Sequence, residues 1–199
     1  MKSNVCKIEN GTKDLAAILA ESERVAEYNG LTYKQTMQLR LLCEEIDGML
    51  PNMIDEFEGS FWIEFEEGIC KIHVSIEISE INSDKKEALI GIAKDKKNVA
   101  AVGIVGKIRD AIENFFLNED REATISTSPI SFHLATGYSE GIDYLYLWSL
   151  EQYKLSVREE KRSEAWDELE KSVIASVADD VIVGVKGKQA DIMIVKKFA

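Results

Sequence analysis

Residues Leu39 to Leu50, "LRLLCEEIDGML", are mostly apolar, with two adjacent glutamates set among the apolar side chains. The apolar residues continue a longer stripe at helical spacing, which comprises Met37, Leu41, Leu42, Ile46, Met49 and Met53. The stripe predicts a long helix that begins after Thr32, a candidate N-cap. Gly48 should weaken this helix, and Pro51 should kink or interrupt it.

The two glutamates are not equivalent in this pattern. Glu45 falls beside Met49 at the edge of the apolar stripe, whereas Glu44 lies about 100° further round the helix, toward solvent. We therefore expect Glu44 to be solvated and regard Glu45 as the candidate for chemistry.

Other helices and hairpins flank this helix. A short strand in "NVCKIEN", residues 4–10, is followed by a helix capped by Thr12 that ends at Asn29-Gly30, with apolar positions Leu15, Ile18, Leu19 and Val25. After the long helix, residues 60–78, "SFWIEFEEGICKIHVSIEI", alternate between apolar and polar side chains and predict a hairpin that turns at Glu67-Gly68.

The second half of the chain continues the alternation. The first predicted elements are a helix from Asp84 to Ala93, a helix with Val105, Ile108, Ile112 and Phe115 on one face, and a strand from Ile130 to Leu134. An apolar segment at 144–157 and a charged link at 158–164 come next. The chain then continues with a helix from Ser163 to Asp179, which has Trp166, Leu169, Val173 and Val177 in the core, and with a hairpin that turns at 186–189. With few signs of parallel crossovers, the pattern predicts one α+β domain over 1–199, built as a two-layer α/β sandwich.

Composition restricts the partners. The chain has 36 acidic and 24 basic residues and a net charge of -12, which argues against nucleic acid and anionic membranes as partners. No apolar run is long enough to span a bilayer, and the start of the chain lacks the apolar run of a signal peptide. The three cysteines, Cys6, Cys43 and Cys70, lack CxxC spacing and are expected to be reduced core thiols, so we expect a cytoplasmic protein.

Among glycine motifs, only "AAVGIVGKIRD", residues 100–110, resembles a phosphate loop. It fails the GxxxxGK[ST] and GxGxxG patterns because Ala101 occupies the first glycine position. Gly103, Gly106 and Lys107 nevertheless lie near the start of a predicted helix, where free N–H groups could receive a phosphate. The alternative is that the glycines allow close helix packing.

Other catalytic motifs find little support. The two histidines, His73 and His133, lie in strand-like alternation, without the ligand spacing of a zinc site. No GxSxG elbow supports a catalytic triad. Nothing near Cys43 would depress its pKa, so it too is expected to be a core thiol.

The opening strand, helix, "GL" turn and long helix with "LRLLCEEIDGML" resemble the start of the anti-sigma-factor serine kinases of the GHKL superfamily of ATPases. The last 35 residues are similar to the closing helix and hairpin of that family, and "LRLLCEE", "FEGSFWIE" and "WSLEQY" also resemble uncharacterised clostridial-type proteins labelled ATP-binding. The resemblance covers roughly the first 80 and last 35 residues. It implies the histidine kinase-like ATPase fold, with residues 83–162 as an enlarged lid or insertion.

The resemblance assigns the family's acid to Glu45. The family's Mg²⁺-ligating Asn would come four residues later, where this chain has Met49, and a thioether is a poor ligand for Mg²⁺. Asn52, seven residues after Glu45, is near the same face, but Pro51 intervenes. The family's DxGxG turn corresponds to "IEISEINSD", residues 76–84, which has no glycine. The family's GxGLG loop is matched only in part by residues 102–110.

The resemblance thus implies a regulatory protein with a degenerate GHKL site that acts by binding a protein partner. Weak binding of ATP or ADP with Mg²⁺ would use Glu45, Gly103, Gly106 and Lys107, and enzymatic activity is not expected. The alternatives are an active ATP-dependent serine kinase of the anti-sigma type and an interaction domain without a small-molecule ligand. By analogy with the family, a homodimer is a further expectation.

Overall fold

The computed structural model describes residues 1–9, 15–54, 57–77, 103–117, 145–159, 163–186 and 188–198. These residues form an antiparallel sheet in the order β1-β2-β3-β6-β5-β4. Its strands are β1 (Cys6–Glu9), β2 (Glu58–Glu66), β3 (Ile69–Glu77), β4 (Leu145–Ser149), β5 (Asp180–Lys186) and β6 (Gln189–Lys197). The described helices are α1 (Leu15–Tyr28), α2 (Tyr33–Met53), α4 (Gly103–Leu117), α7 (Leu150–Glu159), α8 (Ser163–Lys171) and α9 (Val173–Val177). The α+β class is therefore confirmed.

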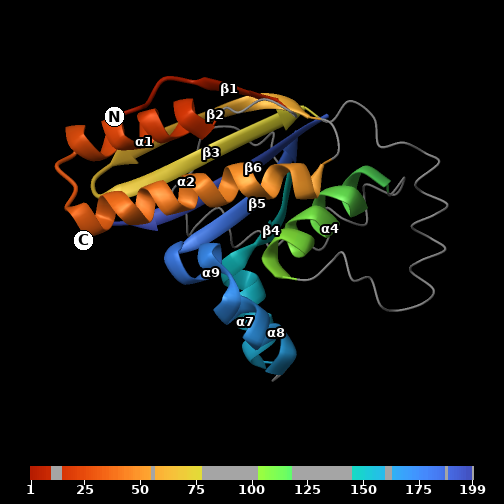
Figure 1. Ribbon diagram of the computed structural model, residues 1–199. Coiled ribbons are helices and arrows are strands. Elements are labelled where there is room, and N and C mark those ends of the chain that lie inside the picture. The colour runs from red at the N-terminus through yellow and green to blue at the C-terminus, as the bar shows by residue number, and fades with distance from the viewer. Residues whose placement is uncertain are drawn as a thin grey trace.

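One face of the sheet forms the core together with the helices. Because side chains alternate along a strand, β2 and β3 each present one apolar set to this face. The buried residues include Phe61, Ile63, Ile72, Val74, Ile76, Ile192 and Ile194. Figure 1 shows α1 and α2 lying across this face, with α4 beside the C-terminal part of α2. Within the described ranges, no helix is long and apolar enough to cross a membrane.

The two predicted hairpins are present. β2 and β3 are joined by Glu67 and Gly68, which both have positive φ, as a tight hairpin turn requires. β5 and β6 pair from Lys186↔Gln189 to Asp180↔Val195, so the closing hairpin turns where the sequence predicts. Between the hairpins, β3 pairs with β6 and completes the centre of the sheet.

Helix α2 begins as predicted but buries a different stripe. Thr32 accepts a hydrogen bond from the Gln35 backbone N–H, and the Gln35 side chain accepts one from Thr32 N, which forms a capping box. The buried residues are Leu39, Leu42, Cys43, Ile46, Met49 and Leu50. Met37 and Leu41 are each 37% exposed, so their predicted place in the core is wrong. The helix also continues through Pro51 to Met53, because a proline in the last turn disrupts few helical hydrogen bonds.

The N-terminal residues form a tether that joins β2 to α1. Ser3 N donates to Ile63 O at 2.8 Å, and Ile63 N donates to Ser3 Oγ at 2.9 Å. On the other side, Asn4 donates from N (3.1 Å) and from Nδ2 (3.0 Å) to the carboxylate of Glu21, which is only 6% exposed. Arg24 pairs with the same carboxylate at 3.0 Å. Glu21 is therefore a buried acid whose charge is compensated locally.

The predicted closing helix at 163–179 is divided in two. Ser172 has an extended backbone conformation, and its side chain accepts a hydrogen bond from Ala175 N, so it ends α8 and caps α9. Trp166 is 42% exposed and its Nε1 donates to Glu170, so its predicted core position is wrong. Leu169 is buried, as predicted.

Helix α4 follows the predicted apolar face closely. Ile108 and Ile112 are buried, as predicted, but Ile104 rather than Val105 is the fully buried residue of the first turn. Two described elements lie within the segment 83–162 that is predicted to be an insertion. One is α4, which packs against α2, and the other is β4, which pairs with β5 as an outer strand of the sheet. The Thr12 cap, the helix at 84–93, the strand at 130–134 and His133 lie outside the described residues.

Candidate functional site

The predicted nucleotide site depends on α2 and α4, which pack against each other. Glu45 is half-buried on α2, at the edge of the core, as its helical position predicts. Glu44 is not simply solvated, because it accepts a hydrogen bond from Arg40 Nε at 3.0 Å, and Arg40 also pairs with Glu23 at 2.8 Å. Of the two adjacent glutamates, Glu44 is therefore the one that Arg40 contacts.

Met49 lies in the core rather than in a site. Its side chain is 4% exposed, among the buried residues of α2 and the sheet. A buried thioether one turn after Glu45 offers no oxygen to a Mg²⁺ ion on this face of the helix. Within the described parts of the chain, no group of three or more metal-ligating side chains was found.

The glycines of α4 occupy its first turn. Gly103 is the first residue of the helix, Gly106 is buried, and Lys107 is half-buried. Burial of Gly106 on a helix packed against α2 favours the close-packing explanation of this glycine. No salt bridge joins Lys107 to Glu45, both of which the structure describes. The fold thus brings the two predicted halves of the site onto adjacent helices without joining their charged groups.

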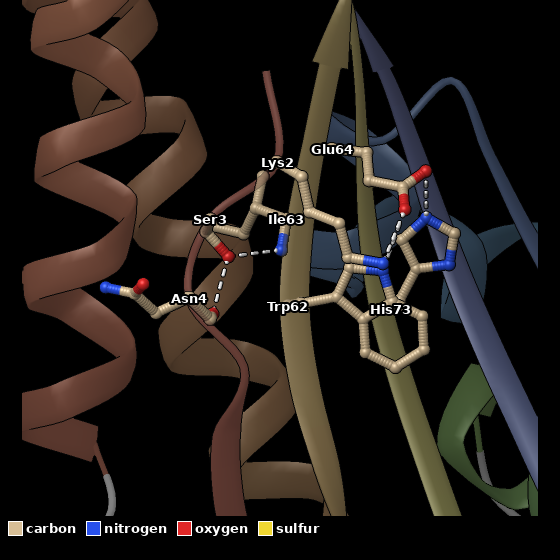
Figure 2. Close-up of polar contacts among 7 residues, drawn as sticks. All are labelled: Lys2, Ser3, Asn4, Trp62, Ile63, Glu64 and His73. Atoms are coloured by element: carbon tan, nitrogen blue, oxygen red, sulfur yellow. Dashed lines mark hydrogen bonds and ion pairs between the residues drawn. The ribbon is translucent and has the colours of Figure 1, made fainter.

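A second concentration of polar groups lies on the sheet face opposite the helices. On that face, Trp62 of β2 stacks on His73 of β3, with ring centroids 4.8 Å apart and planes 2° apart. Trp62 Nε1 donates to Glu64 Oε1 at 3.0 Å, and His73 Nε2 lies 3.5 Å from Glu64 Oε2. Lys2 pairs with Glu64 at 3.2 Å and lies 4.9 Å from the Trp62 ring centroid. Figure 2 shows the four side chains of this aromatic-acid cluster beside the Ser3 tether.

Burial makes the ionisation of the cluster unusual. It lowers the pKa of His73 to about 4, despite the opposing effect of Glu64, so the imidazole is neutral at neutral pH. Burial alone would raise the pKa of Glu64, but His73, Lys2 and Trp62 outweigh it and lower that pKa. His73 Nε2 and Asp191 Oδ2 are buried and have no hydrogen-bond partner among the described residues.

Sequence reasoning places His73 correctly as a half-buried strand residue but misses the cluster around it. The spacing of Trp62 and Glu64, two residues apart on one strand, signals a shared face. The contact with His73 depends on the hairpin register, and the contact with Lys2 depends on a pairing of residues more than 60 positions apart.

The buried thiols Cys43 and Cys70 are free, and burial raises the pKa of both, that of Cys70 to about 12.

The comparisons with known proteins supply no family. No protein-family model matches the chain, and neither a curated protein nor a solved structure matches it.

Proposed function

We propose that this chain is a regulatory protein of GHKL-like architecture that acts by binding a protein partner and has at most weak affinity for ATP or ADP. The burial of Met49 is the observation that carries the proposal. In an active family member the corresponding side chain would hold Mg²⁺ on the nucleotide phosphates, and here it is part of the hydrophobic core. Phosphoryl transfer depends on metal and phosphate positioning, so the proposal disfavours the kinase alternative.

The order of elements supports the GHKL-like architecture. The chain begins with a strand, two helices and a hairpin and ends with a hairpin, and between the two hairpins lie α4, β4, α7, α8 and α9. α4 packs against the helix that carries Glu45. Any nucleotide would therefore bind where α4 packs against α2, with Lys107 near the phosphates.

An exposed apolar strip on α1 and α2 supports the partner-binding function. Tyr28 is 75% exposed, Tyr33 is 81% exposed, and Met37 and Leu41 are each 37% exposed. Tyr33, Met37 and Leu41 recur every four residues along α2, so they share one side of the helix. Large apolar side chains in one exposed row are a frequent feature of protein interaction sites.

A thermal-shift titration with Mg²⁺-ATP, Mg²⁺-ADP and no nucleotide tests the nucleotide part. Binding at about 100 times the dissociation constant should stabilise the protein by about 2.7 kcal/mol. A Glu45→Ala protein should lose this stabilisation, whereas Glu44→Ala serves as the matched control. No shift at about millimolar nucleotide would favour the ligand-free interaction domain, and Mg²⁺-dependent transfer of phosphate to a protein would restore the kinase alternative.

Photocrosslinking tests the interaction strip. A benzoylphenylalanine residue placed at Tyr33 should give one discrete protein adduct in cells, and Leu41→Glu in the same protein should abolish it. The same photoreactive residue at Trp166, an exposed aromatic position on α8, is the control. An adduct of twice the mass of the chain would identify a homodimer as the partner. Identical adducts from both positions, unaffected by Leu41→Glu, would rule out the strip as the interaction site.

A further inference from the structure

A polar cavity opens on the sheet face opposite α2, where β1 ends, β2 begins, β3 ends and β6 begins. Its volume is about 640 Å³, and it is a shallow depression that is largely open to solvent. Lys7, Ser60 and Ser75 line it and alternate along their strands with the buried residues Ile8, Phe61 and Val74. The cavity is therefore separate from the α2–α4 region and independent of the proposed function.

The floor of the cavity is held in place by hydrogen bonds. Gln189 Nε2 donates to Ser75 Oγ at 2.5 Å and to Asp191 Oδ1 at 3.2 Å. With its amide hydrogens directed to these two acceptors, Gln189 leaves Oε1 as an acceptor for a ligand. Ser75 Oγ accepts from Gln189 and so retains a hydroxyl hydrogen that it can donate. The half-buried Asp191 thus helps to hold the Gln189 amide, which leaves the Ser75 hydroxyl as a donor and Gln189 Oε1 as an acceptor side by side.

The charges around the floor largely cancel. The lining contains two lysines and two glutamates, Lys7, Lys188, Glu58 and Glu77. Lys7 pairs with Glu58 at 2.8 Å and with Glu9 at 3.1 Å, and the hydrogen bonds that its ammonium donates to these acids raise the pKa of Lys7. An anionic ligand would compete with two carboxylates for Lys7, and the chain as a whole carries a net charge of -12. The cavity therefore favours a neutral ligand over an ionic one.

From this geometry we infer that the cavity binds a neutral, polyhydroxylated small molecule of the size of a mono- or disaccharide. Such a ligand both donates and accepts hydrogen bonds, which matches the hydroxyls of Ser60 and Ser75 and the free amide oxygen of Gln189. Few apolar side chains line the cavity, so hydrogen bonding rather than apolar contact supplies the affinity. Because each sugar hydroxyl exchanges water for protein, the binding is of millimolar strength.

The test uses the full chain and observes backbone amide shifts by NMR during titration with glucose, galactose and maltose, and with inorganic phosphate and glycine as ionic comparisons. At least one sugar should give saturable shifts centred on Ser60, Ser75 and Gln189, with a dissociation constant on the order of millimolar. Ser75→Ala should weaken that binding by about tenfold, as expected for the loss of one or two hydrogen bonds. Ser176→Ala, an exposed serine on α9, is the matched control and should leave the binding unchanged.

Three results would overturn the inference. They are the absence of saturable shifts with every sugar, binding of phosphate or glycine without binding of a sugar, and sugar binding undiminished in Ser75→Ala. Because Ser75 is half-buried and its side chain faces the cavity, Ser75→Ala is expected to fold. The amide spectrum shows this directly, and Ser60→Ala provides a second variant on the neighbouring strand.

Discussion

His73 determines how stability depends on pH at the scale of single residues. Its pKa is lowered to about 4 in the folded chain, whereas an unfolded histidine titrates near 6.5. As pH falls from about 6.5 toward 4, the unfolded chain binds the proton first, so the free energy of unfolding falls by up to about 3 kcal/mol. The charged groups that act on His73 are Glu64, Lys2, Lys71 and Asp191.

We predict that His73→Gln removes this slope in urea unfolding between about pH 6.5 and 4.5. Glu64 does not add to the slope in this pH range. Its pKa is lowered in the folded chain, so its contribution to the free energy of unfolding is complete above its unfolded pKa of about 4.5 and is lost only at lower pH. His133→Gln is the matched control, since it removes the only other histidine. An unchanged slope in the His73 variant would show that the imidazole is not kept neutral by the fold.

Glu21 gives a second prediction at this scale. Glu21→Ala removes the acceptor of two hydrogen bonds from Asn4 and the partner of Arg24, so the free energy of unfolding should fall by about 2–3 kcal/mol. Glu23 lies on the same helix as Glu21 but pairs across to Arg40 of α2 in an exposed ion pair, so Glu23→Ala should cost less than about 1 kcal/mol. Chemical denaturation of the two variants compares them, and equal losses would contradict a special role for the buried acid.

At the scale of elements, substitution of two glycines by alanine should change the stability of the fold in opposite directions. A Cβ at Gly48 meets nothing within 4 Å, so Gly48→Ala should stabilise α2 by about 0.5–1 kcal/mol. A Cβ at Gly59 would lie 2.2 Å from Ser75 O in the neighbouring strand, so Gly59→Ala should destabilise by at least about 2 kcal/mol. Thermal unfolding of both proteins measures the difference. A loss of stability in Gly48→Ala would mean that α2 needs a glycine there.

The same scale shows what the sequence can predict. Strict alternation and the Glu67-Gly68 turn predict the β2–β3 hairpin, because both signals are local. The predicted buried stripe of α2 includes Met37 and Leu41, whereas the fold buries Leu39 and Cys43 instead. Both pairs match the helical period equally well. Which of two overlapping stripes is buried depends on the sheet against which the helix packs, and periodicity alone does not contain this information.

The candidate sites show the same limit. The half-buried place of Glu45 follows from its helical position, but the packing of α4 against α2 is a long-range contact that no local motif encodes. The break at Ser172 has a local cause, a serine whose side chain caps the next helix, but the continuous apolar spacing of 166–177 conceals it. The cavity at Ser75 and Gln189 joins residues more than 100 positions apart and becomes visible only once β3 and β6 pair.

At the scale of the whole molecule, Cys43 and Cys70 report on the integrity of the two layers. Both thiols lie between helix and sheet, fully buried, with raised pKa values. Thiolate is the reactive form, so we predict that both react with a thiol reagent only as fast as the chain unfolds globally. Labelling of a Cys6→Ser protein at increasing denaturant measures this rate. Fast labelling of either cysteine under native conditions would show that the layers open locally.

The outer strands of the sheet have a consequence for how copies of the chain behave when crowded together. β1 has four residues and carries Lys7 and Glu9, and β4 has five residues with a register shift between Tyr146 and Trp148. The longer β2 is covered beyond the end of β1 by the backbone of Met1 to Ser3. A growing fibril needs a long, straight row of unpaired backbone groups onto which the next chain can add. Neither outer strand provides such a row, so the sheet is protected against strand-by-strand aggregation.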